Sequence, residues 1–514
     1  MLFQRESGLL LHPTSLPGPY GIGEIGASAL HWLDELRAME QRIWQVLPLG
    51  PTGFGDSPYQ SFSSFAAAPL LLSLDSLVER GLLERSATMS ASFAEGNIDF
   101  GSVIAARLPL LRRAAREFVR GAQGADGAAF EKFRRRQSGW LGDWALFDAL
   151  KQVHEARPWT EWPADLRARD PAAVARAREE LAEPIAEAEA LQFLVDAQWS
   201  AVRGHARALG VTIVGDIPIF VAHDSADVWQ HRELFEVDAN GQPESVAGVP
   251  PDYFSRTGQR WGNPLFRWSA HAAEDYSWWR ARVRRALELV DVVRIDHFRG
   301  FAAYWEIPAS EPTAIKGRWV PGPGADLFEL LRRDLGVLPI IAEDLGLITP
   351  DVAALRDDLA LPGMRVFQFA FGGDVDNPHL PDHYVENCVA YSGTHDNDTL
   401  AGWLAGETTA STRTTVAVRR ERARFLRYIR RKKRRLPADL RWACLEILLS
   451  SRAGGVVLPL QDVLGVGSEA RMNTPGRADG NWRWRFRGEE LTPSIKSKLA
   501  RRTLAAGRNA RVIG

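Results

Sequence analysis

The stretch VVRIDHFRG at residues 292–300 ends an apolar, β-branched run on an arginine and an aspartate. Three more apolar runs end on acidic residues in the same way, namely IVGDIPIF at 213–220, IIAEDLG at 340–346 and YSGTHDNDT at 391–399. Short runs of this kind are typical of strands that are buried on both faces, as in a parallel sheet. Because the carboxyl ends of parallel barrel strands meet at one mouth, the four stretches predict a cluster of acidic side chains there.

Apolar runs of this type recur along the chain with helical patterns between them, which predicts an α/β fold. The eight runs occupy residues 8–12, 43–49, 211–220, 290–295, 338–343, 365–371, 389–393 and 455–460. Eight strands that alternate with helices are typical of a (β/α)8 TIM barrel. The 514 residues suffice for such a barrel with insertions.

Two long segments interrupt the predicted barrel. Residues 75–207 are rich in Ala, Arg, Glu and Leu, and we expect a helical subdomain there, inserted at the C-terminal face of the strands. Residues 1–74 then form the first part of the barrel and residues 208–514 the remainder. Within the latter, residues 238–266 are rich in Gly, Pro and aromatic residues, and we expect an irregular loop with a function.

Composition narrows the classes of partner. The formal net charge of -1 argues against nucleic acid and anionic membranes as partners. Cys388 and Cys444 have no zinc-binding spacing and fit a reducing cytoplasm. The N-terminal apolar run is too short for a signal peptide, and no stretch approaches a membrane span.

A dense basic run at residues 419–435 raises the question of a nucleic-acid patch. Phe425 and Ile429 are four residues apart, which favours an amphipathic helix. We therefore interpret the arginines and lysines as its solvated face.

Several carboxylates at one mouth indicate either a metal site or glycoside chemistry, although any one of them alone is more often a helix cap or turn residue. Arg294 and Asp296 are two apart on a strand and so share a face. The guanidinium then favours an ionised Asp296, as a nucleophile requires, and disfavours a bound metal ion. Nearby Asp296 and Asp396 should raise the pKa of Glu343, which can then donate a proton near neutrality.

At these residues the chain resembles a known family. RIDHFRG, AEDLG and GTHDNDT, with GDIPIFV before them, are similar to motifs of the α-amylase superfamily in its 4-α-glucanotransferase (amylomaltase) branch. Three further stretches resemble that branch in particular, namely SPYQSFSSFA, GVPPDYFSRTGQRWGNPLF and the opening GLLLHPTSLPGPYGIG. The resemblance extends over essentially the whole chain, from Gly8 to Trp484.

The resemblance implies transfer of α-1,4-glucan segments with retention, in which Asp296 is the nucleophile, Glu343 the general acid and base, and Asp396 the stabiliser of the transition state. It implies no cofactor and no metal. The implied partners are maltooligosaccharides, amylose-type α-1,4-glucans and glucose.

It also implies substrate contacts. Arg294 supports the nucleophile, His297 and His395 bind sugar hydroxyls, and Asp216 closes the floor of the site. The remaining implied contacts are Tyr59 stacked on the reactive glucose, Asn473 at the mouth, and Asp252, Gln259 and Trp261 on a loop over the glucan. Residues 248–264 have the glycines, prolines and aromatics of a lid that excludes water.

Two alternatives stay open from the sequence. One is an α-glucan hydrolase of the same superfamily, and the other is a non-catalytic glucan-binding protein. The complete set of Asp296, Glu343 and Asp396 argues against the second alternative.

Overall fold

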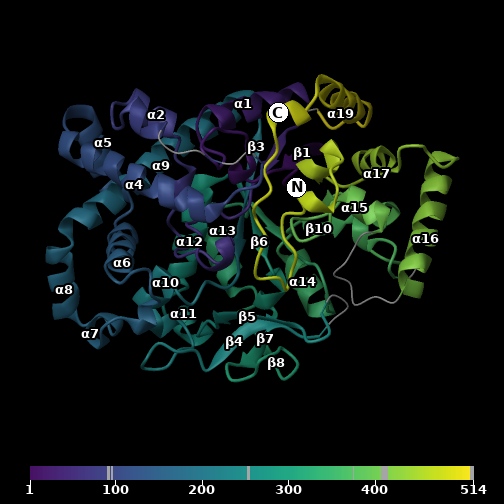
Figure 1. Ribbon diagram of the computed structural model, residues 1–514. Coiled ribbons are helices and arrows are strands. Elements are labelled where there is room, and N and C mark those ends of the chain that lie inside the picture. The colour runs from purple at the N-terminus through teal and green to yellow at the C-terminus, as the bar shows by residue number, and fades with distance from the viewer. Residues whose placement is uncertain (90–92, 94–95, 252–254, 374–375, 407–414, 510–514) are drawn as a thin grey trace.

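A closed barrel of eight parallel strands forms the centre of the computed structural model (Figure 1). The structure describes all residues except 90–92, 94–95, 252–254, 374–375, 407–414 and 510–514. Around the barrel the strand order is β1-β12-β11-β10-β9-β6-β3-β2. The strands are β1 (Glu6–Leu10), β2 (Ile43–Gln45), β3 (Thr212–Pro218), β6 (Val292–Asp296), β9 (Ile340–Ala342), β10 (Gly363–Val366), β11 (Cys388–Tyr391) and β12 (Gly455–Pro459). Each overlaps one of the eight predicted runs, β10 by only two residues, and the predicted (β/α)8 barrel is confirmed.

Inward-facing side chains fill the barrel because successive residues of a strand point to opposite faces. The interior cluster includes Leu10, Ile43, Val214, Val292, Ile341, Met364, Val366, Val389, Tyr391 and Val457. Residues of the opposite face, such as Ile213, Val293 and Ile295, pack into the larger core under the helices. The barrel is therefore a packed support for its mouth and not a channel.

Helices surround the barrel. They are α1 (Ala27–Ala38), α10 (Ala226–Gln230), α11 (Trp268–Ala273), α12 (Ser277–Leu289), α13 (Asp326–Leu335), α14 (Pro350–Asp358), α15 (Leu400–Ala405), α16 (Thr415–Lys433), α17 (Leu440–Leu449), α18 (Leu460–Leu464) and α19 (Pro493–Ala505). Within the described part of the chain, no helix has the length and apolar character needed to cross a membrane.

Residues 75–207 are largely helical in the structure, on the left of Figure 1. Their helices are α2 (Leu74–Glu79), α3 (Arg85–Thr88), α4 (Phe100–Gly121), α5 (Gly124–Arg136), α6 (Leu141–Val153), α7 (Ala164–Arg167), α8 (Pro171–Glu180) and α9 (Ala182–Leu209). Helix α9 packs on α4, α6 and α1 and ends at Gly210, whose φ of 66° is the left-handed conformation typical of a helix end. The division of the chain at residues 75 and 207 stays a prediction.

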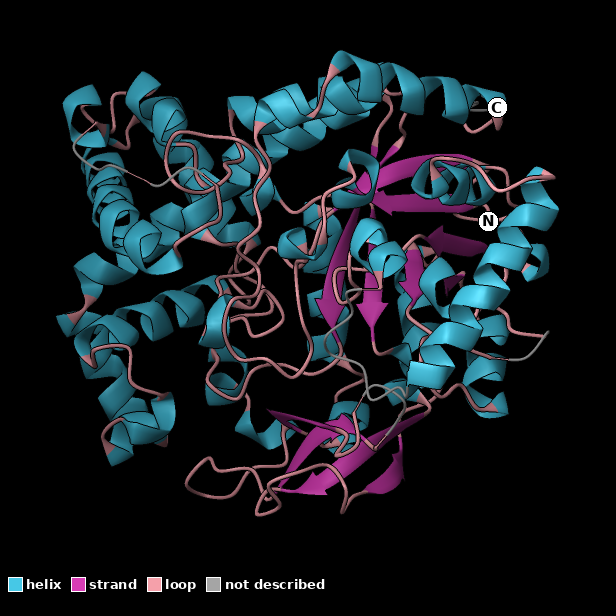
Figure 2. Ribbon diagram, turned by 45° about the vertical axis from the view of Figure 1, so that its right-hand side comes forward, coloured by secondary structure: helices cyan, strands magenta, loops and turns pink. Residues whose placement is uncertain are grey.

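The segment 238–266 contains regular strands, so the expected irregular loop was wrong, whereas the expected function of the segment stays a prediction. It contains β4 (Ser245–Val249) and β5 (Gln259–Pro264). With β7 (Ala303–Pro308) and β8 (Arg318–Pro321) they form a four-stranded sheet in the order β5-β4-β7-β8, the lower sheet of Figure 2. The antiparallel pairing of β4 with β7 joins residues about 60 positions apart, and the pattern of one segment does not reveal such a pairing.

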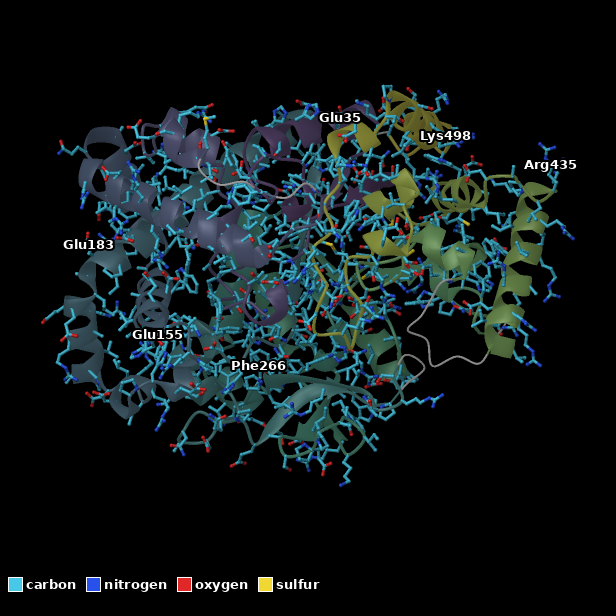
Figure 3. The ribbon with its side chains drawn as sticks, in the orientation of Figure 1. Glu35, Glu155, Glu183, Phe266, Arg435 and Lys498 are labelled. Atoms are coloured by element: carbon cyan, nitrogen blue, oxygen red, sulfur yellow. The ribbon has the colours of Figure 1, made fainter. Side chains whose placement is uncertain are left out.

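The basic run lies on α16, as predicted. Phe425 and Ile429 are buried against the body of the molecule, whereas Arg419, Arg427 and Arg430 are exposed. Figure 3 shows Arg435 just beyond this helix, at the edge of the molecule. The amphipathic interpretation is confirmed.

Candidate active site

Three neighbouring barrel strands bring acidic residues together at their carboxyl ends. Strand β6 lies between β3 and β9, and Asp216 is paired in register with Arg294. Ala342 is the register partner of Ile295, so Glu343 follows at the level of Asp296. Asp396 comes from a loop five residues beyond the end of β11.

Arg294 joins two of these carboxylates. Its Nη1 donates to Asp216 Oδ2 at 2.6 Å, and its Nη2 donates to Asp296 Oδ1 at 2.8 Å. This geometry confirms that Arg294 and Asp296 share a face. The Asp216 side chain is fully buried, whereas 31% of the Asp296 side chain is exposed. Asp296 is therefore the carboxylate of this pair that a ligand can reach.

Glu343 is buried next to this pair. Its Oε2 accepts from the backbone N–H of His297 at 2.6 Å, and its Oε1 accepts from that of Leu345 at 2.8 Å. His297 has a φ of 54°, an unusual left-handed conformation for a non-glycine residue, which fits a position constrained by its surroundings. Burial and the charge of Asp296 raise the pKa of Glu343 to about 8, although Arg294 and both N–H groups oppose the rise. The predicted direction of the shift is confirmed, and Asp296 is one of its causes, but burial is the larger cause and Asp396 is not among the main ones.

Asp396 is held at the mouth of the site by side chains of two loops. Asn473 Nδ2 donates to Asp396 Oδ1 at 2.6 Å, and His395 Nε2 lies 3.4 Å from the same oxygen. The backbone N–H of Asn473 also donates to the carbonyl of His395 at 3.0 Å. The Asp396 side chain is 47% exposed, compared with 31% for Asp296.

Tyr59 lies between Asp216 and His395. Its hydroxyl donates to Asp216 Oδ2 at 2.9 Å, and its ring stacks on His395 with centroids 5.0 Å apart. The ring of Trp482 lies 5.7 Å from that of Tyr59. Burial raises the pKa of Tyr59 well above its ordinary value, so its hydroxyl stays a donor.

These residues border an open cleft of about 290 Å³. Trp261 and Gln259 line it from β5, and Trp261 packs edge-on against the ring of His297 at 4.9 Å. His297 Nε2 is buried and has no hydrogen-bond partner among the described residues. Asp216, Arg294 and Glu343 lie behind the lining, and Asp252 falls outside the described residues.

Some lining residues were not predicted. Gln60 Nε2 donates to Asn263 Oδ1 at 3.4 Å, and both side chains face the cleft together with Arg477 and Trp482. Gln60 and Asn263 stand beside Tyr59 and Trp261 in the stretches SPYQ and QRWGNP, which was the signal for them. In the described part of the chain, no three His, Cys, Asp or Glu residues are grouped to hold a metal ion.

The mouth of the (β/α)8 barrel carries an accessible carboxylate beside a carboxyl of raised pKa, and aromatic and amide side chains line the cleft above them. This combination defines an enzyme of glycoside chemistry. A family profile described as 4-alpha-glucanotransferase matches residues 11–492. The chain belongs to this family.

Individual relatives agree with the family. A 4-alpha-glucanotransferase of Thermus thermophilus is 49% identical over 507 residues, covering 97% of this chain and 98% of the relative. A 4-alpha-glucanotransferase of Synechocystis sp. is 43% identical over 512 residues, covering 99% of each chain. The solved structure of a Streptococcus agalactiae amylomaltase in complex with acarbose superimposes with a TM-score of 0.92 at 36% identity, covering 98% of this chain and 100% of that one.

Proposed function

We propose that the protein transfers α-1,4-glucan segments from a maltooligosaccharide donor to the 4-hydroxyl of an acceptor glucan or glucose, with retention at the anomeric carbon. The observation that carries the proposal is the unlike pair at the ends of β6 and β9. Asp296 is reachable and paired with Arg294, whereas burial and Asp296 raise the pKa of its neighbour Glu343. Retaining glycosidases need such a nucleophile and such a proton donor.

In the first half of the reaction, an oxygen of Asp296 attacks the anomeric carbon of the donor. Because Arg294 holds Oδ1, Oδ2 is the oxygen left to attack. The bond from the anomeric carbon to the leaving oxygen breaks, and that oxygen takes the proton of Glu343. The product is a glycosyl ester on Asp296 together with the shortened leaving glucan.

The same pair supports the second half. Once Asp296 is an ester it carries no charge, so one of the causes that raise the pKa of Glu343 is removed. Glu343 is then a better base and takes the proton of the acceptor 4-hydroxyl. The acceptor oxygen bonds to the anomeric carbon, the ester bond breaks, and the carboxylate of Asp296 is restored.

The other residues grip the sugar. We propose that Tyr59 stacks on the reactive glucose above Asp216. The unpaired Nε2 of His297 and the ring of His395 then bind hydroxyls of this glucose. Asp396, together with Asn473, binds the hydroxyls that shift as the sugar ring flattens. Gln259 and Trp261 cover the glucan from β5. A contact from Asp252 remains part of the proposal, although this residue lies outside the described residues. This cover favours sugar over water as the acceptor.

We also propose amylose-type α-1,4-glucans among the substrates and a cytoplasmic location. Cys388 and Cys444 are free and buried, which fits a reducing compartment.

Incubation with maltotriose alone tests the proposal. Transfer yields glucose together with maltooligosaccharides longer than the substrate, and we expect this pattern. A hydrolase yields only shorter products, and a binding protein yields none, so either result would overturn the proposal. The Asp296→Ala variant is the control for contaminating activity.

A further inference from the structure

The loop that carries Asn473 is closed at its base by its own hydrogen bonds. The backbone N–H of Trp482 donates to the carbonyl of Met472 at 2.7 Å, and the backbone N–H of Thr474 donates to Asn481 Oδ1 at 2.9 Å. These bonds fix the shape of the loop 471–482. One further backbone bond, from the N–H of Asn473 to the carbonyl of His395 at 3.0 Å, ties this loop to the residue that precedes Asp396.

One guanidinium spans both loops. Arg471 Nε donates to the carbonyl of Asn473 at 2.6 Å, and Arg471 Nη2 donates to the carbonyl of Asp396 at 2.6 Å. The side chains of the same two residues are also hydrogen-bonded, because Asn473 Nδ2 donates to Asp396 Oδ1. The planar fork of arginine suits two acceptors in a fixed relation, and the ammonium of lysine does not reproduce it.

We infer that Arg471 is a positioning residue that sets the carboxylate of Asp396 against the substrate by joining the backbones of the two loops. This inference rests on the proposed function, in which Asp396 stabilises the transition state. Arg471 bonds carbonyl oxygens and leaves the carboxylate to Asn473 and to the sugar. Arg294, in contrast, bonds the carboxylates of Asp216 and Asp296 directly.

The first test is the kinetics of Arg471→Met with maltotriose. Because Asp396 acts mainly in the transition state, we expect kcat to fall by roughly 10- to 100-fold while KM changes by less than about threefold. Arg471→Lys keeps a donor that reaches one carbonyl and should recover part of the loss. The matched control is Arg487→Met, because Arg487 lies on the surface and pairs with Glu490. It should keep wild-type kinetics, and an equal loss in this control would overturn the inference.

A double-mutant cycle separates positioning from general destabilisation. With α-maltosyl fluoride as an activated donor, Asp396→Asn alone should be severely impaired, and adding Arg471→Met should slow it by less than about threefold more. If Arg471→Met costs the same factor with and without Asp396→Asn, Arg471 does not act through Asp396 and the inference is wrong. If Asp396→Asn alone keeps wild-type transfer, the proposed role of Asp396 fails instead, and with it the reason to position this residue.

Discussion

Asp296 and Asp396 face the same cleft, but Asp296 ends a barrel strand whereas Asp396 sits on a loop. Asp296 is hydrogen-bonded to Arg294, which also binds the fully buried Asp216. Asp216 lies on the neighbouring strand β3, in register with Arg294. Asp396 is almost half exposed and depends on Asn473 from a distant part of the chain.

The difference matches the two tasks that we propose for the site. Nucleophilic attack requires the reacting atoms in one fixed geometry, which a packed barrel supplies. Gripping a sugar whose ring flattens requires contacts that follow the substrate, and loops supply these. We therefore expect changes on the strands to stop the chemistry or destabilise the fold, and changes on the loops to alter rate or product balance in a stable protein.

The largest expected effect is that of Asp296→Ala. Removing the proposed nucleophile should lower transfer from maltotriose by roughly 10⁴-fold or more, with folding and glucan binding nearly unchanged. Steady-state product analysis measures transfer, thermal unfolding measures folding, and calorimetry measures the binding of maltooligosaccharides. The control is Asp334→Ala, because Asp334 is a surface carboxylate paired with Arg280 and Arg284. Transfer within about tenfold of wild type would falsify the assignment.

Arg294→Met should damage stability as well as rate. It leaves Asp216 buried without its cation, and breaking a buried pair costs about 3–5 kcal/mol. Burial already raises the pKa of Asp216 to about 7, and losing Arg294 raises it further. A carboxyl with a raised pKa loses stability as pH rises from its unfolded pKa to its folded pKa, so the gap between variant and wild type should widen above pH 7.

Thermal unfolding of both proteins between pH 6 and pH 8.5 measures this gap. If the difference in stability between the variant and the wild type stayed constant over this pH range, it would contradict the attribution of the loss to Asp216. Arg471→Met, measured alongside, should unfold close to wild type even though it is slow, and this result would sharpen the contrast between strand and loop.

The smallest expected effect is that of Trp261→Ala, which opens the cover on β5. The ratio of hydrolysis to transfer should rise severalfold while total turnover changes little, because water then competes with the acceptor for the ester. Product analysis with maltotriose measures the ratio. Trp319→Ala is a control from the same sheet outside the cleft lining, and its ratio should stay that of wild type. An unchanged ratio in Trp261→Ala would count against the cover.

Hydrophobic periodicity and the residues at strand ends predicted those features of the fold and the site that depend on local sequence. The eight strands could be predicted because each is a short apolar run. The contact of Arg294 with Asp296 could be predicted because side chains alternate between the two faces of a strand. The sheet of β4, β5, β7 and β8 was not readable, because it depends on pairing between distant segments. The burial of Glu343 and the reach of Arg471 to Asp396 are likewise properties of the folded chain.

The central claim is that Asp296 takes the glycosyl group while Glu343 moves the proton, and Glu343→Gln tests it most directly. Gln accepts only one of the two backbone N–H donors that Glu343 binds, so its thermal unfolding is checked first. Fluoride leaves without a proton, so α-maltosyl fluoride should still load the variant, whereas maltotriose should react poorly. Release to an acceptor should then slow by roughly 10²- to 10⁴-fold because the base is missing. Mass spectrometry of the denatured, digested protein should find maltose on the peptide that contains Asp296. A label on another carboxylate, or wild-type transfer from maltotriose in this variant, would contradict the account.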